Sequence, residues 1–296
     1  MTTPTLRALC LPGCGCRGAF QFGVMRRLWE RGERFDVVAG ASSGAICGAV
    51  TVAGLAPSGP DMFRSLATTP IVSTRYLRSE RSPFGMRAIV REALARFVPE
   101  DRIVGSESEL LVSTTRAGQL LKSMWARARS LATPRGAQRT PAAPTGATYP
   151  FEAPSPVHAM ALEHGALVVH SSRDRADMHD IIVASSTIPG LYARLPVVDG
   201  EVHVDGGAAD NTLLHVLLAR GITDITVVTP YGGGAVSPTL FERERPPRVP
   251  PHVRLRLIYP RAPIRLRHFD FDRDRLEEAL EMEMVEEEYD ARRGAA

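Results

Sequence analysis

The sequence predicts an α/β fold of three layers, in which a mainly parallel sheet lies between two layers of helices. The first observation is that short apolar runs, typical of buried strands, alternate with segments whose apolar residues recur at helical spacing. Strands separated by helices usually pair in parallel and are covered on both faces. The second is that two glycine-rich turns near the N-terminus each join a predicted strand to a predicted helix. The third is size, because 296 residues with 44% apolar content can bury such a core without disulfides or metals.

The elements follow one another along the chain. The predicted strands cover residues 6–11, 35–39, 109–115, 166–170, 202–204, 223–229 and 253–259. The predicted helices cover residues 19–31, 43–54, 86–97, 175–184 and 212–220. In the first helix, Phe20, Val24 and Leu28 recur every fourth residue. A last helix is predicted over 272–290, because Leu276, Leu280 and Met284 have the same spacing.

Ser42 lies in a Gly-x-Ser-x-Gly turn, from Gly40 to Gly44, between a predicted strand and a predicted helix. This is the layout of a nucleophile elbow, in which a sharp turn presents one side chain to the substrate and the glycines permit a strained backbone. Ser42 is therefore a candidate nucleophile. In a second interpretation, Ser42 or Ser43 only caps the helix that follows. The turn by itself does not decide between the two.

A glycine-rich loop, Gly13-Cys14-Gly15-Cys16-Arg17-Gly18, joins the first predicted strand to the first predicted helix. Its backbone N–H groups suit an anion, either a bound phosphate or the oxyanion formed during acyl transfer. Gly13, Gly15 and Gly18 also match the dinucleotide fingerprint, which requires an acidic residue at the end of the next strand. Asp36 lies instead at the start of that strand, whose end leads into the serine turn. An oxyanion loop beside a nucleophile explains both glycine turns, whereas nucleotide binding explains only the first.

Asp205 is the candidate base for Ser42. It follows the short predicted strand 202–204 and precedes Gly206 and Gly207, which allow the backbone to bend around the carboxylate. The alternative is structural, since Asp-Gly is also a common hairpin signal and a turn aspartate often caps its own backbone.

Taken in this order, the three motifs resemble those of the patatin-like phospholipase family, over about residues 6–230. Val183-Ala184-Ser185-Ser186-Thr187-Ile188-Pro189-Gly190 is similar to the family's segment before the catalytic aspartate, Leu111–Thr115 to its central strand, and Asn211 to its asparagine after the aspartate. The resemblance implies that Ser42 is the nucleophile and Asp205 the base of a Ser-Asp dyad. It implies that the N–H groups around Cys14 and Gly15 form the oxyanion hole, with Arg17 near the phosphate end of a lipid. No metal or cofactor is expected.

One residue departs from the family's pattern. The family usually has three consecutive glycines where this chain has Gly13-Cys14-Gly15. If position 14 requires a positive φ, the cysteine strains the loop by about 1 kcal/mol and slows the enzyme. If the loop accepts cysteine at a negative φ, replacing it with glycine gains nothing. The first outcome is the expectation.

The sequence predicts a catalytic domain over residues 6–230 and a C-terminal extension over 231–296 that packs on the same domain. The net charge of +3 is too small to indicate nucleic acid as a partner. A basic, proline-rich insertion is predicted near residues 116–157, because residues 110–151 hold six Lys or Arg residues and no acid. Its start carries Leu120, Leu121, Met124 and Trp125, and apolar side chains among cations suit an anionic membrane surface. The alternative is a solvated insertion.

The N-terminus has neither the cationic start nor the apolar core of a signal peptide, and no apolar run reaches transmembrane length. The four cysteines, Cys10, Cys14, Cys16 and Cys47, match no usual zinc spacing and are expected to be reduced thiols. We therefore expect a cytoplasmic protein in peripheral contact with the inner membrane.

The predicted function is that of a serine acyl hydrolase, a carboxylic ester hydrolase that acts on a lipid or another ester, as phospholipase A or a lysophospholipase does. One alternative is an α/β-hydrolase-type triad with His215, His252 or His268 as base, although that fold normally places several strands before its serine. Another is a lipid-binding or scaffold protein on the same fold. Cys14 favours this last alternative, and the intact Ser42 and Asp205 oppose it.

Overall fold

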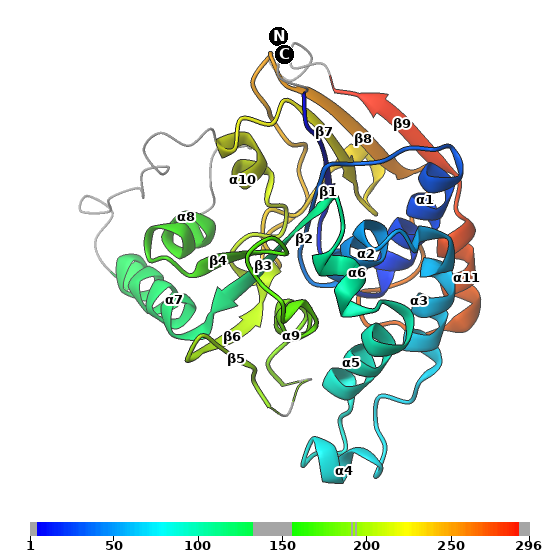
Figure 1. Cartoon of the computed structure of the whole chain (residues 1–296). Helices are drawn as coiled ribbons and strands as arrows, with labels where there is room; N and C mark the ends of the chain where they lie inside the picture. The colour runs from blue at the N-terminus through cyan, green and yellow to red at the C-terminus, as the bar shows by residue number, and fades with distance from the viewer. Residues whose placement is uncertain (1–4, 133–155, 191, 193, 290–296) are drawn as a thin grey trace.

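The computed structural model describes residues 5–132, 156–190, 192 and 194–289. They form a nine-stranded sheet with helices against both of its faces (Figure 1). The strand order is β5-β6-β3-β2-β1-β7-β8-β9, and β4 pairs with β3 beside this path. The predicted α/β fold with a mainly parallel central sheet is confirmed.

Parallel pairing joins the five strands at the centre of the sheet. They are β1 (Arg7–Leu11), β2 (Val37–Gly40), β3 (Glu109–Arg116), β7 (Asp224–Val228) and β8 (Arg254–Pro260). The other strands pair antiparallel: β4 (Leu167–Ser171), β5 (Val197–Val198), β6 (Glu201–Asp205) and β9 (Met284–Glu288). Because parallel strands are covered on both faces, β1 and β2 are buried almost throughout, whereas β5 and β9 are largely exposed.

Alternate residues of the central strands face two separate cores. Leu9 and Leu11 of β1 belong to the larger core, and Ala8 and Cys10 to the smaller one. The helices of the larger core are α1 (Gly18–Glu30), α2 (Ser43–Val52), α3 (Gly59–Thr68), α5 (Met86–Phe97), α6 (Glu100–Val104), α9 (Met178–Ser185) and α11 (Arg273–Glu281). The smaller core is covered by α10 (Leu214–Ala219).

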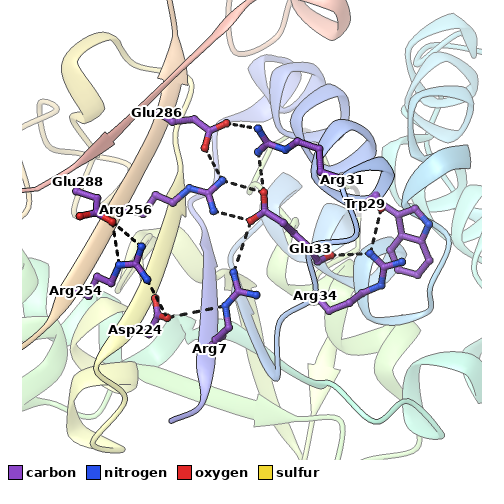
Figure 2. A network of polar contacts seen from close by, with 10 residues as sticks. All are labelled: Arg7, Trp29, Arg31, Glu33, Arg34, Asp224, Arg254, Arg256, Glu286 and Glu288. Atoms are coloured by element: carbon purple, nitrogen blue, oxygen red, sulfur yellow. Dashed lines mark hydrogen bonds and ion pairs between the residues drawn. The ribbon is translucent and has the colours of Figure 1, made fainter.

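The prediction of one helix over 272–290 is wrong in its second half. The helix α11 ends at Glu281, and Met284–Glu288 forms β9, antiparallel to β8. A helix through this segment would end in three consecutive glutamates, and negative charge is unfavourable at a helix C-terminus. As a strand, the segment lies beside two arginines of β8: Figure 2 shows Arg254 paired with Glu288 and Arg256 with Glu286.

Arg256 lies at the centre of an ion-pair network that ties β9 to the rest of the molecule (Figure 2). It is 2.6 Å from Glu33, which follows α1, and 2.6 Å from Glu286 on β9. Arg31 pairs with the same two acids, at 2.8 and 2.6 Å. The hydrogen bond from Arg256 holds the pKa of Glu33 below its usual value. Because the side chains of Arg256 and Glu33 are only 17% and 18% exposed, solvent screens this pair less than a surface pair.

The other predicted elements agree with the structure to within three residues at each end. The sequence did not predict α3, α6 or the short helix α4 (Tyr76–Ser79). It also did not predict α7 (Ala117–Ala132) and α8 (Pro156–Glu163), which pack together at the two ends of the predicted insertion. Residues 133–155, most of that insertion, lie outside the described residues.

Arg256→Gln should lower the free energy of unfolding by about 1–3 kcal/mol, because it removes the shared partner of two partly buried carboxylates. The measurement is urea denaturation at neutral pH. Arg254→Gln is the matched control, since Arg254 is 63% exposed and an exposed pair contributes about 0–1 kcal/mol. Equal losses in the two variants would contradict the central position of Arg256.

Candidate active site

The turn after β2 holds Ser42 in a strained backbone conformation. Its φ of 52° and ψ of −124° are rare for a residue with a side chain, and α2 begins at the next residue. The flanking glycines have no room for a Cβ, which on Gly40 would lie 2.5 Å from the Gly44 carbonyl oxygen and on Gly44 1.9 Å from that of Leu11. The Ser42 N–H donates to Ser185 Oγ at 2.9 Å. The backbone geometry predicted for a nucleophile elbow is therefore present.

Asp205 ends β6 and is 2% exposed. Its Oδ1 accepts the Gly207 N–H at 2.8 Å, while Oδ2 has no hydrogen-bond partner among the described residues. A Cβ on Gly206 would lie 2.2 Å from the Ser113 carbonyl oxygen, so the backbone after Asp205 packs directly against the backbone of β3. Asp205 thus caps its own turn, as the structural interpretation expected, and keeps a second oxygen for another partner.

The register of β3 explains how Asp205 comes to Ser42. The β2 pairing ends with Gly40 opposite Val112, and the β6 pairing has Asp205 opposite Thr114. Because β4 pairs along the opposite edge of β3, β2 and β6 share one edge end to end. Asp205 therefore lies about 7 Å beyond the end of β2, in the direction in which the chain continues to Ser42.

The electrostatics of Asp205 agree with this placement. Burial raises the pKa of Asp205 to about 7, while the hydroxyl of Ser42 and the Gly207 N–H oppose the rise. The register of β3 brings Ser42 towards this carboxyl, whose Oδ2 accepts no hydrogen bond from the described residues. A buried carboxyl that titrates near neutral pH next to a serine hydroxyl can accept and return a proton.

The glycine loop lies directly against Ser42. Asn211 holds it in place, because Oδ1 accepts the Gly13 N–H at 3.0 Å and Nδ2 donates to the Gly13 carbonyl at 2.9 Å. A Cβ on Gly13 would lie 2.9 Å from the Cβ of Ser42, and one on Gly207 would lie 2.5 Å from Asn211 Oδ1. The sequence placed Asn211 in a motif but gave it no function, and the structure shows it joining the loop to the segment after Asp205.

Cys14 does not strain the loop, contrary to expectation. Its φ is −153°, and the positive φ of 58° belongs to Gly15. The Cys14 N–H donates to Ser43 Oγ at 3.0 Å and is therefore occupied. The thiol is also unsuited to chemistry, since burial raises the pKa of Cys14 to about 12.

Two other backbone donors at the site have no acceptor among the described residues. They are the N–H groups of Gly15, the first residue of the 3₁₀ helix η1 (Gly15–Arg17), and of Ser43, the first residue of α2. First-turn N–H groups have no partner within their own helix. Both residues border the same cavity as Ser42.

The C-terminal extension holds the second half of the glycine loop. The Cys16 N–H donates to the His268 carbonyl at 2.9 Å. Arg17 Nε donates to the Leu266 carbonyl at 2.9 Å, and its guanidinium lies 5.4 Å from the Tyr231 ring centroid. Gly18 begins α1, where a Cβ would lie 3.1 Å from that of Ser43. Sequence reasoning missed the contribution of residues after 230, because no motif surrounds them.

Two cavities meet at this site. An apolar cavity of about 130 Å³ begins at Ser42 and is bordered largely by hydrophobic side chains, among them Ile46, Phe63, Leu66, Ile71, Met86 and Val90. A polar cleft of about 990 Å³ includes Gly13 and Asn211 and carries six charged side chains, Arg17, Glu242, Glu244, Arg267, Asp270 and Arg275. Ile188, His268 and Phe269 border both. The apolar and polar ends of an amphiphilic ester would therefore find different surroundings on either side of the serine.

Of the three histidines considered as bases, only His268 borders the cavity at Ser42. Its Nε2 lies 3.1 Å from the Tyr231 hydroxyl, and burial lowers the pKa of His268. His215 is instead paired with Asp210, with 2.6 Å between Nδ1 and Oδ2. His252 is exposed and does not border either cavity.

The four cysteines are buried free thiols. In the part of the chain that the structure describes, no group of three or more His, Cys, Asp or Glu side chains is arranged to hold a metal ion. None of the described helices is both long and apolar enough to span a membrane.

Comparison with known proteins identifies the family of this chain. The profile of the family described as Patatin-like phospholipase matches residues 9–218, most of the chain. The chain belongs to this family. Members of this family are lipid hydrolases.

Among solved structures, patatin-like VipD from Legionella pneumophila is similar, with a TM-score of 0.41 and 15% sequence identity. The match covers 78% of this chain and 51% of VipD, so the chain spans about half the length of that structure. A comparison with curated proteins finds no match.

Gly15→Ala should lower the free energy of unfolding by about 2–4 kcal/mol. The new Cβ combines a positive φ with an approach of 2.4 Å to the His268 carbonyl oxygen. Cys14→Ala, one residue away at an ordinary φ, is the control and should cost about 1 kcal/mol. Urea denaturation compares the two, and a larger loss at Cys14 would contradict the assignment of the strained position to Gly15.

Proposed function

We propose that this protein is a serine lipid acyl hydrolase, a carboxylic ester hydrolase of the phospholipase A or lysophospholipase type, with Ser42 as nucleophile and Asp205 as base. The observation that carries the proposal is the meeting of β2 and β6 on one edge of β3, which brings a serine on a strained turn close to a buried carboxyl with a pKa of about 7. Membership of a family of lipid hydrolases supports the substrate class.

In the proposed reaction, Ser42 Oγ attacks the ester carbonyl carbon while its proton passes to Asp205. The carbonyl oxygen becomes an oxyanion, for which the free N–H groups of Gly15 and Ser43 are the proposed donors. Asp205 then returns the proton to the leaving alcohol as the C–O bond breaks, which leaves an acyl-serine. Water attacks this ester while Asp205 takes one of its protons, and Asp205 then gives that proton to Ser42 Oγ as the acyl–oxygen bond breaks, which frees the fatty acid and restores both groups. Serine, carboxylate and water supply every group, so the reaction requires no metal or cofactor.

The two cavities suggest how the substrate would lie. The acyl chain fits the apolar cavity that begins at Ser42, and the alcohol portion with its head group fits the polar cleft beside Gly13. Arg17 borders the cleft, where it is available to a phosphate. In this proposal residues 6–230 carry the reacting groups, and residues 231–296 complete the same domain by closing the cleft.

Ser42→Ala should lower kcat for a soluble short-chain ester by about a thousandfold or more, because it removes the nucleophile. Asp205→Asn should cause a comparable loss. The control is His268→Ala, the alternative base in the same cavity, which should cost less than about tenfold. A fluorophosphonate probe should label the wild type and not Ser42→Ala. Labelling of that variant would remove Ser42 from the mechanism, and a loss at His268 equal to that at Asp205 would favour the triad.

The pH profile supplies a separate test of Asp205. The base must be ionised, so kcat/KM should rise with pH and level off above a pKa of about 7. The folded protein binds this proton more tightly than the unfolded chain, whose carboxyl has its usual pKa of 3.8. Asp205 therefore lowers stability progressively as pH rises from about 4 to 7. Asp205→Asn should remove this dependence and raise the melting temperature at about pH 8. A melting temperature below that of the wild type would contradict the buried, ionised carboxylate.

A further inference from the structure

A loop between α3 and α5 projects from the body of the molecule, with the short helix α4 at its tip (Figure 1). We refer to residues 72–85 as the α4 loop. Its two ends are joined at the base, where Val72 forms a β-bridge with Phe84. The Gly85 N–H donates to the Ile71 carbonyl at 2.8 Å, and the Ser73 N–H to that of Pro83 at 2.9 Å.

The interior of the α4 loop is well packed. Tyr76 is 2% exposed, and its hydroxyl donates to the Pro70 carbonyl at 2.9 Å. Gly85 lies against the Tyr76 ring, where a Cβ would be only 2.2 Å from the nearest ring carbons. Glu80, which is 3% exposed, pairs with Arg87 at 2.9 Å. The loop therefore has a definite shape, and its one acidic side chain is already neutralised.

In contrast to this packed interior, the outer surface of the α4 loop carries exposed apolar side chains and arginines. Val72, Leu77 and Phe84 are 60%, 51% and 40% exposed, whereas Tyr76 in the interior of the loop is buried. Three arginines accompany them, Arg75, Arg78 and Arg81, and Arg78 and Arg81 have no acidic partner in the described part of the chain. Apolar side chains surrounded by unpaired cations are the composition that binds the interface of an anionic bilayer.

The base of the α4 loop leads to Ser42. Ile71 and Met86, the residues at its two ends, border the apolar cavity that begins at Ser42. Phe269, another border residue of this cavity, is 58% exposed. A lipid drawn from a bilayer on which the α4 loop rests would therefore enter the cavity beside the point of contact.

The membrane contact expected from the sequence lay elsewhere, at the start of the basic insertion. Leu121, Met124 and Trp125 of α7 are indeed exposed, at 56%, 51% and 68%. None of them borders the cavity at Ser42, and α7 lies well apart from α4 in Figure 1. Exposed apolar side chains therefore occur on both α7 and the α4 loop. The α4 loop is the better candidate for membrane contact, because its ends lead to the cavity at Ser42.

We propose that the α4 loop docks this protein on an anionic lipid bilayer and so presents the apolar cavity to the membrane. The arginines attract the negative surface, and Val72, Leu77 and Phe84 enter the interface between head groups and acyl chains. The proposed docking is inferred from the surface of the α4 loop alone, whereas its benefit to catalysis rests on the proposed function.

The test measures binding to sedimented vesicles of phosphatidylcholine mixed with phosphatidylglycerol, with Ser42→Ala in every protein so that the lipid stays intact. Leu77→Glu should lower the partition coefficient by about tenfold or more. Arg78→Gln should lower it by about fivefold at low salt, and much less on phosphatidylcholine alone. The matched control, Met124→Glu on α7, should leave it unchanged. Thermal unfolding checks that each variant is folded.

Unchanged binding in both Leu77→Glu and Arg78→Gln would overturn the proposal, as would a loss confined to Met124→Glu. Self-association that Leu77→Glu abolishes, without vesicle binding by the parent protein, would assign the surface to a second copy of the chain instead. In active protein, Leu77→Glu should hydrolyse a soluble short-chain ester at the parent rate and a vesicle lipid more slowly. Failure of the parent protein on the soluble ester would refute the proposed function and leave the binding result intact.

Discussion

The site depends on one constraint of the sheet, the division of a single edge of β3 between two strands. The first half of that edge pairs with β2 and the second with β6, which runs in the opposite direction. The end of a parallel strand and the end of an antiparallel one therefore meet beside the middle of β3. Ser42 and Asp205, 163 positions apart in the chain, are neighbours for this reason. The same junction leaves little space, which explains why close approaches of backbone surround it at Gly40, Gly44 and Gly206.

The arrangement combines strain and burial that the surrounding fold must hold in place. Ser42 has a positive φ, and the carboxylate of Asp205 is buried with one oxygen free of hydrogen bonds within the described residues. Each feature lowers stability, since a strained residue costs about 1–3 kcal/mol and a buried charge is poorly solvated. The compensation lies in the hydrogen bonds that fix the neighbouring backbone, from Ser42 to Ser185 and from Gly13 to Asn211. A carboxyl with a pKa near 7 results from this balance and would be lost in a more exposed site.

The residues after 230 contribute both to the central sheet and to the candidate site. Strands β8 and β9 extend the sheet, and Tyr231, Leu266 and His268 hold the glycine loop from outside. His268 and Phe269 also stand between the apolar cavity and the polar cleft. The C-terminal segment and Ile188 therefore together form the boundary between the two ends of a proposed lipid substrate, while the proposed reacting groups come from the first two thirds of the chain.

The sequence by itself determined seven of the nine strands, most of the long helices and the three motifs. These depend on local patterns, namely apolar periodicity, and glycines where the backbone turns or is crowded. It could not determine how contacts between the motifs set their backbone conformations and hydrogen bonds. The φ of Cys14 and its occupied N–H follow from the way two loops from different strands touch. The same contact leaves the N–H groups of Gly15 and Ser43 without an acceptor among the residues that the structure describes. The segment 272–290 shows the same limit for secondary structure. Leu276, Leu280 and Met284 have helical spacing, yet Met284 lies in the strand β9. There the arginines of β8 and the open edge of the sheet outweighed local periodicity. Long-range pairing decided these features because it supplies charge partners and backbone acceptors that no local pattern records.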